Sequence, residues 1–338
     1  MMISARKLSL LIFFIILSCN STTKNNIKEI VSINGKTMGT TYNIKFLPKT
    51  NNPNEVEKNY RAIEKILKDI NLQMSTYIEE SEISIFNNFE STKWFKISKD
   101  FEIVLTKSQE YYELSNGKYD ITIMPLVNLW GFGPQAFNNK PSKAKVDSVK
   151  SFIGQNLIEI DNQKIRKKDP RVQIDLSSIA KGYAVDKLFD EFSYYEELFI
   201  EIGGEIRTKS TIKDWKIGIN TPEINNINND IELIVSLNNS SIATSGNYRN
   251  YYFEEDKFYH HGISTNTGYP ILSNVGSVSV ISSKSCMDAD ALSTMLYVMD
   301  SKSINDIIEN ISHAESLVIR VKDDGSFSKE FSSNFLKN

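Results

Sequence analysis

The stretch DLSSIAKGYAVDKL (residues 175–188) gathers several reactive side chains in one short turn. The preceding run VQIDL (172–176) predicts a strand, and the apolar spacing of 177–192 predicts a helix that begins near Ser177 or Ser178. The free N–H groups and positive dipole end of a helix suit a phosphate, which Lys181 can also reach. Asp175 can accept hydrogen bonds from a ribose or a base. In the structural alternative, which has equal weight, Ser177 caps the helix and Gly182 allows close packing.

Strands and helices are mixed along the chain without strict alternation, which indicates an α+β fold. Strands are also expected over 40–47, 197–204, 215–220, 231–237, 241–246, 257–264, 275–282, 315–321 and 327–332. Helices are also expected over 53–77, 98–117, 287–299 and 301–311. Asn54 is the expected N-cap of the first of these, and Ser98 opens and Gly117 closes the second. The apolar, glycine-punctuated segment 125–134 is expected to be a loop.

Length and charge restrict the possible functions. With 338 residues, the chain can bury a substantial core, in one large domain or two intimate ones. Its formal net charge is -3, and acidic and basic residues are interspersed. The sequence therefore gives no electrostatic reason to expect a nucleic-acid partner.

The N-terminus indicates export. Two basic residues precede an apolar run over 8–17, which is too short to span a bilayer and suits a signal peptide over 1–18. The ending ILSC (16–19) resembles a bacterial lipobox, in which Cys19 is lipidated and residues 19–30 form the tether. A plain secretory signal with an incidental cysteine is the alternative. Lipidation of Cys19 leaves Cys286 as the remaining thiol, so that no internal disulfide is possible.

The segment SCMDADALSTMLYVM (285–299) holds a possible metal site. Asp290 and Thr294 are four residues apart and would share one face of a helix. A carboxylate and a hydroxyl provide oxygen ligands suited to Mg²⁺, with water and phosphate oxygens completing six positions. Alternatively, Asp290 favours the helix dipole and Thr294 bonds back to the carbonyl of residue 290. The segment alone favours this alternative.

Two further segments carry polar groups of interest. His260 and His261 lie at the end of an expected strand, where adjacent side chains face opposite ways, so that at most one of them can line a pocket. A surface histidine is the usual outcome, and zinc is not expected because no Cys/His cluster is present. In SIATSGNYRNYY (241–252), Arg249 can pair with a phosphate or a carboxylate.

Taken in order, these segments resemble the FAD:protein FMN transferase (ApbE-like) family. The matching motifs are MGTTYNI (38–44), MSTYIEESEIS (74–84), GKYDITIMPLVNLWGFGP (117–134), IDLSSIAKGYAVD (174–186), IEIGGEIR (200–207), IATSGNYRNYY (242–252), HHGISTNTGYP (260–270) and DADALST (288–294). The resemblance implies a single large ApbE-like (T-fold-like) domain over 31–338, with mixed and antiparallel sheets and flanking helices. Where the family has a turn of the form HIIDPxTG, this chain has HGISTNTG (261–268), so that no chemical role is assigned to position 264.

The resemblance also implies the reaction and the site. Such enzymes bind FAD and Mg²⁺, cleave FAD, attach FMN by a phosphoester to a threonine or serine of an exported protein, and release AMP. The implied flavin site contains Met38, Tyr77, Lys118, Tyr119 and Asp120, and the implied nucleotide site contains Asp175, Ser178, Lys181 and Ile263. The implied metal ligands are the carbonyl of Ala180 and the side chains of Asp290 and Thr294.

Phosphoryl-transfer chemistry assigns the remaining roles. Lys181 adds positive potential beside the diphosphate, and the attacking hydroxyl needs a proton acceptor. His261 is the first candidate for this acceptor and Asp290 the second. The expected location is the bacterial cell envelope, with a lipid anchor on Cys19 and the enzyme facing the periplasm. Two alternatives remain: a periplasmic FAD pyrophosphatase or FAD-binding lipoprotein without an acceptor, and a structural surface lipoprotein with a degenerate site.

Overall fold

The computed structural model describes residues 29–50, 52–135, 140–223, 230–247, 251–254, 257–299 and 304–337. The expected signal peptide, Cys19 and most of the expected tether lie outside these residues, as does Arg249. Within the described residues, no helix has both the length and the apolar character needed to cross a membrane.

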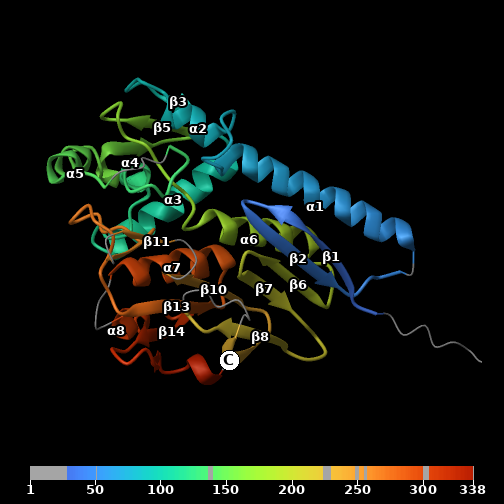
Figure 1. Ribbon diagram of the computed structural model, residues 1–338. Helices are drawn as coiled ribbons and strands as arrows, with labels where there is room; N and C mark the ends of the chain where they lie inside the picture. The colour runs from blue at the N-terminus through green and yellow to red at the C-terminus, as the bar shows by residue number, and fades with distance from the viewer. Residues whose placement is uncertain are drawn as a thin grey trace, which may run out of the picture.

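A large antiparallel sheet runs through the molecule (Figure 1). Its eight strands lie in the order β1-β2-β6-β7-β10-β13-β14-β15, and each neighbouring pair is antiparallel. The strands are β1 (Val31–Thr37), β2 (Thr40–Phe46), β6 (Leu198–Ile202), β7 (Glu205–Lys209), β10 (Ser241–Gly246), β13 (Val275–Ser282), β14 (Ala314–Val321) and β15 (Phe327–Phe331).

Helices and three small sheets surround this large sheet. The helices are α1 (Pro53–Met74), α2 (Glu82–Asn87), α3 (Lys99–Leu114), α4 (Met124–Leu129), α5 (Lys143–Lys150), α6 (Ala180–Phe192), α7 (Cys286–Met299) and α8 (Ile304–Ile308), with 3₁₀ turns at Ile121–Ile123, Gln155–Leu157 and Phe335–Lys337. The small sheets join β3 (Phe95–Lys96), β5 (Lys164–Lys167) and β4 (Ile158–Ile160), then β8 (Trp215–Asn220) and β9 (Ile231–Leu237), then β11 (Tyr251–Glu254) and β12 (Lys257–His260). The predicted α+β fold with antiparallel sheets and flanking helices is confirmed.

The large sheet separates two apolar cores. Successive side chains of a strand face opposite sides, so that Ile200 of β6 packs into the core under the helices and its neighbour Phe199 into the other. Helices α1, α3, α6 and α7 contribute to the first core, and the β8–β9 hairpin covers the second. A third cluster joins α4 and α5 to β12. The helices and the hairpin thus hold the sheet from both faces.

Helices α6 and α7 pack side by side on the central strands (Figure 1). A Cβ atom at Gly182 would lie 2.5 Å from the carbonyl oxygen of Cys286 and 2.7 Å from Cβ of Asp290. Any side chain at this position would therefore push the two helices apart. The prediction that Gly182 allows close packing is confirmed.

The strand predicted over 172–176 is wrong, although its apolar side chains are buried as expected. In the described chain this segment is extended but belongs to no sheet, because the side chain of Asn87 takes the place of a neighbouring strand. The Ile174 N–H donates to Asn87 Oδ1 at 2.8 Å, and Asn87 Nδ2 donates to the Ile174 carbonyl at 2.8 Å. One side-chain amide thus satisfies both backbone groups of Ile174.

The helix that follows begins at Ala180, later than predicted. Its N-cap is Ile179, which makes no side-chain cap bond, so that the alternative interpretation of Ser177 as the helix cap is wrong. Ser177 instead donates from its backbone N and its Oγ to the two oxygens of Asp175, at 2.9 and 2.8 Å. This local turn competes with helix formation and delays the helix.

Three smaller differences have simple causes. The N-cap of α1 is Asn52 rather than Asn54, since Asn52 Oδ1 accepts from the Asn54 N–H at 3.0 Å. Helix α4 takes up the first part of the loop expected over 125–134, because a proline fits the first turn of a helix, and residues 130–134 are irregular as predicted. Strand β1 was not predicted. In this strand Gly35 leaves room for the ring of Tyr42, since a Cβ atom at Gly35 would lie 2.5 Å from that ring. Ser98 caps α3 as predicted.

Candidate functional site

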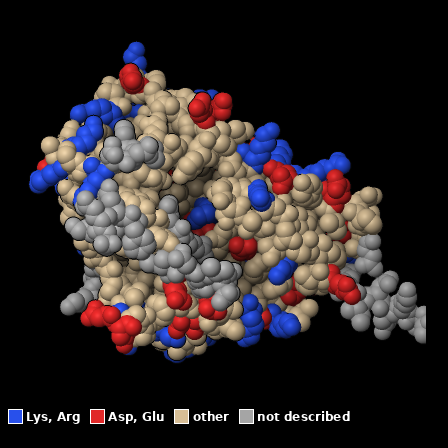
Figure 2. All heavy atoms as spheres, viewed as in Figure 1, with Lys and Arg blue, Asp and Glu red and all other residues tan. Residues whose placement is uncertain are grey.

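A cavity of about 350 Å³ opens between α6, α7, the ends of the central strands and the segment that leads into α4. Figure 2 shows that the visible face is hollowed near its centre and that acidic and basic side chains are mixed around it. The cavity brings together most of the site residues predicted from the sequence: Tyr77, Lys118, Tyr119, Asp120, Asp175, Ser178, Lys181, His261, Ile263, Asp290 and Thr294.

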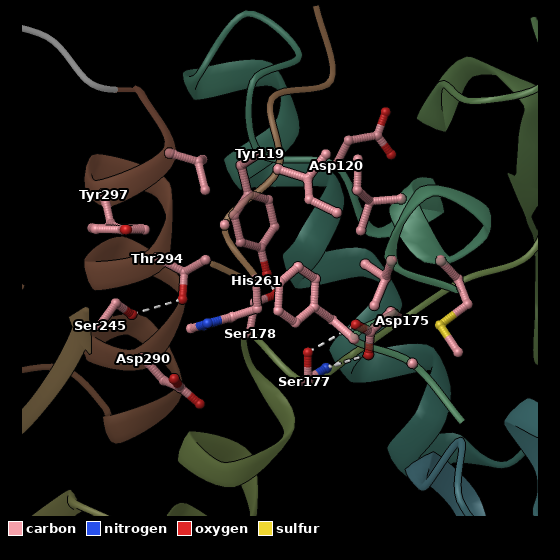
Figure 3. Close-up of a pocket in the computed structure, with 18 of the residues that line it drawn as sticks. Tyr119, Asp120, Asp175, Ser177, Ser178, Ser245, His261, Asp290, Thr294 and Tyr297 are labelled. Atoms are coloured by element: carbon pink, nitrogen blue, oxygen red, sulfur yellow. Dashed lines mark hydrogen bonds between the residues drawn. The ribbon is translucent and has the colours of Figure 1, made fainter. Parts of the chain in front are cut away.

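One wall of the cavity is formed by α7 and β10 (Figure 3). Asp290 and Thr294 lie one turn apart on α7, and Thr294 Oγ1 lies 2.9 Å from Ser245 Oγ of β10. The bond back to the carbonyl of Asp290 comes from Ser293 Oγ, at 2.9 Å. The alternative interpretation of Thr294 as a back-bonding helix residue is therefore wrong, and its hydroxyl lines the cavity.

Asp290 is a buried carboxyl anchored by the neighbouring helix. Its Oδ2 accepts from the Gly182 N–H of α6 at 2.9 Å, so that this N–H in the first turn of α6 already has an anionic partner. Burial raises the pKa of Asp290 to about 7, opposed by the positive charge of Lys181 and reinforced by the negative charge of Glu205. Near neutral pH this carboxyl can therefore exchange its proton for another cation.

Lys181 and Glu205 form an ion pair beside Asp290. Lys181 Nζ lies 2.8 Å from Glu205 Oε1 and 3.8 Å from Asp290 Oδ1. Glu205 is buried, and its other oxygen, Oε2, has no hydrogen-bond partner in the described chain. Two carboxylates thus share one ammonium group at the edge of the cavity.

The opposite wall comes from the turn before α6 and from residues 117–124 (Figure 3). Tyr119 OH lies 2.8 Å from Ser178 Oγ, which ties these two segments together. Asp120 Oδ1 accepts from the N–H and hydroxyl of Thr122 at 2.8 and 2.7 Å, and burial raises the pKa of Asp120 to about 6. Burial also raises the pKa of Asp175. Asp120 Oδ2 accepts from the Gln155 N–H at 3.2 Å, and both oxygens of Asp175 accept from Ser177, so that both carboxyls shape this wall.

His261 lies between the two walls (Figure 3). The neighbouring His260 is turned into the interior, where its Nε2 lies 2.7 Å from the Ile271 carbonyl and its Nδ1 accepts from the Gly262 N–H at 3.1 Å. The prediction that at most one of the two would line a pocket is confirmed. It is the exposed His261 that lines the cavity.

Two predicted residues lie outside this lining. Met38 is in the turn between β1 and β2, with φ 49°, and packs against the core under the helices. Ala180 is the buried first residue of α6 and is adjacent in sequence to Lys181. Neither is among the residues that line the cavity.

Several lining residues were not predicted: Thr76, Glu205, Ser245, Thr265 and Tyr297. The motif IEIGGEIR contained a signal for Glu205, because a Gly-Gly turn ends the strand and the acidic residue follows it at once. In the structure Gly203 and Gly204 have φ 65° and 107° and form the tight turn between β6 and β7. Ser245 lies within IATSG, whose hydroxyls resemble those of an ordinary strand.

The donor set of the α7 wall fits a hard divalent cation. It offers the carboxylate of Asp290, the hydroxyl of Thr294 and, across Lys181, Oε2 of Glu205, which is buried and has no hydrogen-bond partner among the described residues. Among the described residues no group of three or more His, Cys, Asp or Glu side chains is placed to hold a metal ion. Mg²⁺ is often held by one or two carboxylates together with waters and substrate phosphates, so that this small set is sufficient for it.

Comparison with known proteins gives the family. The model of the ApbE family matches residues 38–318. The chain belongs to the ApbE family. A similar ApbE-family protein is the "FAD:protein FMN transferase" of Haemophilus influenzae, 38% identical over 331 residues, which are 95% of this chain and 93% of that protein. The protein of the same name from Vibrio cholerae is 36% identical over 315 residues, covering 91% of this chain and 92% of its own length.

A solved structure agrees with the ApbE family assignment. The structure "Flavin Transferase ApbE from Vibrio cholerae" superimposes on this chain with a TM-score of 0.81 and 35% sequence identity. It covers 91% of this chain and 98% of that one. The ApbE fold therefore extends over nearly the whole described chain.

Proposed function

We propose that this chain, an FAD:protein FMN transferase of the ApbE family, attaches FMN through a phosphoester bond to a threonine or serine of an exported protein and releases AMP. The transferase activity rests on the family match and on relatives that carry this activity in their names. The observation that carries the mechanism is that Lys181, His261, Asp290 and Thr294 line one cavity.

The two walls suit the two kinds of chemistry in FAD. Tyr77, Tyr119 and Ile263 offer aromatic and apolar surface for a flavin ring. Lys181 lies beside the carboxylates of Glu205 and Asp290, where its ammonium can face a diphosphate. We therefore assign the phosphates to the α7 side of the cavity and the flavin to the side of Tyr119.

The transfer is a displacement at the phosphorus on the FMN side of the FAD diphosphate. The acceptor hydroxyl oxygen forms the new P–O bond, the bond to the AMP phosphate breaks, and AMP leaves with its electron pair. The hydroxyl proton passes to His261, while Lys181 supplies positive potential to the phosphate oxygens. The side chains of Asp290 and Thr294, with the carbonyl of Ala180, would hold Mg²⁺. This ion, when bound, supplies further positive charge at the phosphates.

Replacing His261 with alanine is expected to lower FMN transfer by about 10²- to 10⁴-fold, because the attacking hydroxyl loses its proton acceptor. The affinity for FAD, measured by the quenching of flavin fluorescence, should change little. His313→Gln is the matched control, since His313 lies outside the cavity lining and is half-buried. An unchanged transfer rate in His261→Ala with FAD still bound would remove His261 from this role.

The experiment that tests the proposed function uses residues 20–338, FAD, Mg²⁺ and an exported flavoprotein as candidate acceptor. Chromatography follows AMP, and mass spectrometry follows the acceptor. AMP together with an FMN-sized mass gain on one threonine or serine supports the transferase. Release of AMP with no mass gain on any tested acceptor supports the FAD pyrophosphatase. Bound FAD with no AMP would leave a binding protein.

We also propose that Cys19 carries a lipid and anchors the enzyme in the bacterial cell envelope, facing the periplasm. The support is the lipobox-like ending of the apolar N-terminal segment. Cys19→Ser is expected to move the full-length chain from the membrane fraction to the soluble fraction after cell lysis. Continued membrane attachment of this variant would contradict the lipid anchor.

A further inference from the structure

The ammonium of Lys181 lies closer to the carboxylate of Glu205 than to that of Asp290. It makes a hydrogen-bonded ion pair with Glu205 at 2.8 Å, while Asp290 is beyond hydrogen-bond distance at 3.8 Å. Only 26% of the Lys181 side chain is exposed, and Glu205 and Asp290 are almost fully buried, so that solvent screens these charges weakly. The position of the ammonium therefore matters for the charge at Asp290.

The two carboxylates are fixed in different ways. Asp290 is held from α6 by the N–H of Gly182, at 2.9 Å. Glu205 is the first residue of β7, directly after the tight Gly203–Gly204 turn, which sets where its side chain enters the cavity. Between these two groups, Lys181 carries its charge at the end of a long, flexible side chain.

The geometry points to Glu205 as a positioning residue that holds the Lys181 ammonium off Asp290 and leaves the Asp290 carboxylate available to a divalent cation. This inference deepens the proposed function and rests on it. Without the charge of Glu205, the ammonium is drawn to the remaining carboxylate of Asp290 and competes with the cation there. With Glu205 in place, Lys181 stays at the wall, where it can face the phosphates of the substrate.

A different role for Glu205 predicts a different pattern. Its Oε2 is buried and has no hydrogen-bond partner in the described chain, so that Glu205 is also a possible direct ligand of the cation. A direct ligand acts on the cation whether or not Lys181 is present. A positioning residue acts through Lys181, and its effect shrinks when the ammonium is removed.

Mn²⁺ is the probe for the test, titrated into the purified chain saturated with FAD and without acceptor. Electron paramagnetic resonance measures the free ion. Glu205→Gln is expected to weaken Mn²⁺ binding by about 10- to 100-fold, the usual range for residues that support a metal ligand. In a Lys181→Met background the same Glu205→Gln change should cost only a few-fold. An equal or larger loss in that background would overturn the inference, because Glu205 would then act on the cation itself.

Glu201→Gln is the matched control. Glu201 belongs to the same β6–β7 hairpin, where its Oε1 accepts from the Gly204 N–H at 2.9 Å, but it does not line the cavity. Its Mn²⁺ affinity should stay within about twofold of the unaltered chain. If Glu205→Gln fails to fold, Glu205→Asp takes its place; it keeps the charge on a shorter side chain and should weaken binding less than tenfold.

The outcomes separate this inference from the proposed function. Equal Mn²⁺ affinity of Glu205→Gln and the unaltered chain overturns the inference and leaves the transferase intact. Absence of Mn²⁺ binding by the unaltered chain overturns both the inference and the metal-dependent part of the proposed mechanism. Transfer of FMN is measured separately, because a loss of activity alone tests neither the role of Glu205 nor the proposed function.

Discussion

Replacing Asp290 with asparagine is expected to lower FMN transfer by about 10²- to 10³-fold while the protein remains folded. The amide oxygen of asparagine can still accept from the Gly182 N–H, so that the contact between α6 and α7 is kept. What is lost is the negative charge that would hold a cation against the phosphates. Single-turnover transfer, followed by the mass of the acceptor at saturating FAD and Mg²⁺, measures the loss.

The same carboxyl predicts a pH dependence. Burial raises the pKa of Asp290 to about 7, so that below this pH a proton increasingly occupies the carboxylate. A cation must displace that proton, and transfer at limiting Mg²⁺ should therefore fall as the pH is lowered from 8 to 6, more steeply than at saturating Mg²⁺. A transfer rate for Asp290→Asn equal to that of the unaltered chain would contradict the role of this carboxylate.

Replacing Gly182 with alanine is expected to lower the free energy of unfolding by about 1–3 kcal/mol, because the new Cβ has no space between α6 and α7. It would lie 2.5 Å from the Cys286 carbonyl oxygen and 2.7 Å from Cβ of Asp290. Relief of this clash moves Asp290 away from the cavity wall, so that transfer should fall together with stability. Urea denaturation measures the first effect and the acceptor assay the second.

Gly218→Ala is the control for this change. Its Cβ would lie 2.9 Å from Cδ1 of Ile231, whose side chain is 58% exposed and can turn away. We expect Gly218→Ala to change the free energy of unfolding by no more than about 0.5 kcal/mol and to leave transfer unchanged. Equal destabilisation by the two substitutions would show that the contact between α6 and α7 is not the cause.

The sequence predicted those parts of the fold that depend on local pattern. Strands β8, β9, β10 and β13 and the N-cap of α3 lie where alternation and capping residues place them. Patterns failed where a distant side chain decides the structure. The backbone at Ile174 is satisfied by the side-chain amide of Asn87, 87 positions away, and no strand periodicity can reveal such a partner.

The site was predicted in the same uneven way. The spacing of Asp290 and Thr294 placed them on one helix face but by itself favoured a structural role, and the family resemblance assigned both as metal ligands and added residues from the opposite wall. Glu205 was missed because its role depends on a contact with Lys181 that forms only when β7 meets α6. Ser245 was missed because a strand hydroxyl gains significance only beside Thr294 of α7.

The contact between Gly182 and Asp290 joins positions 108 residues apart, and this has a consequence for the order of folding. A growing chain that ends before α7 lacks the Asp290 and Thr294 side of the cavity, however well its earlier elements have formed. Tight FAD binding must therefore wait until the chain is synthesised past Thr294. Once bound, FAD stabilises only the fully assembled molecule, so that a ligand-dependent rise in melting temperature would report complete folding.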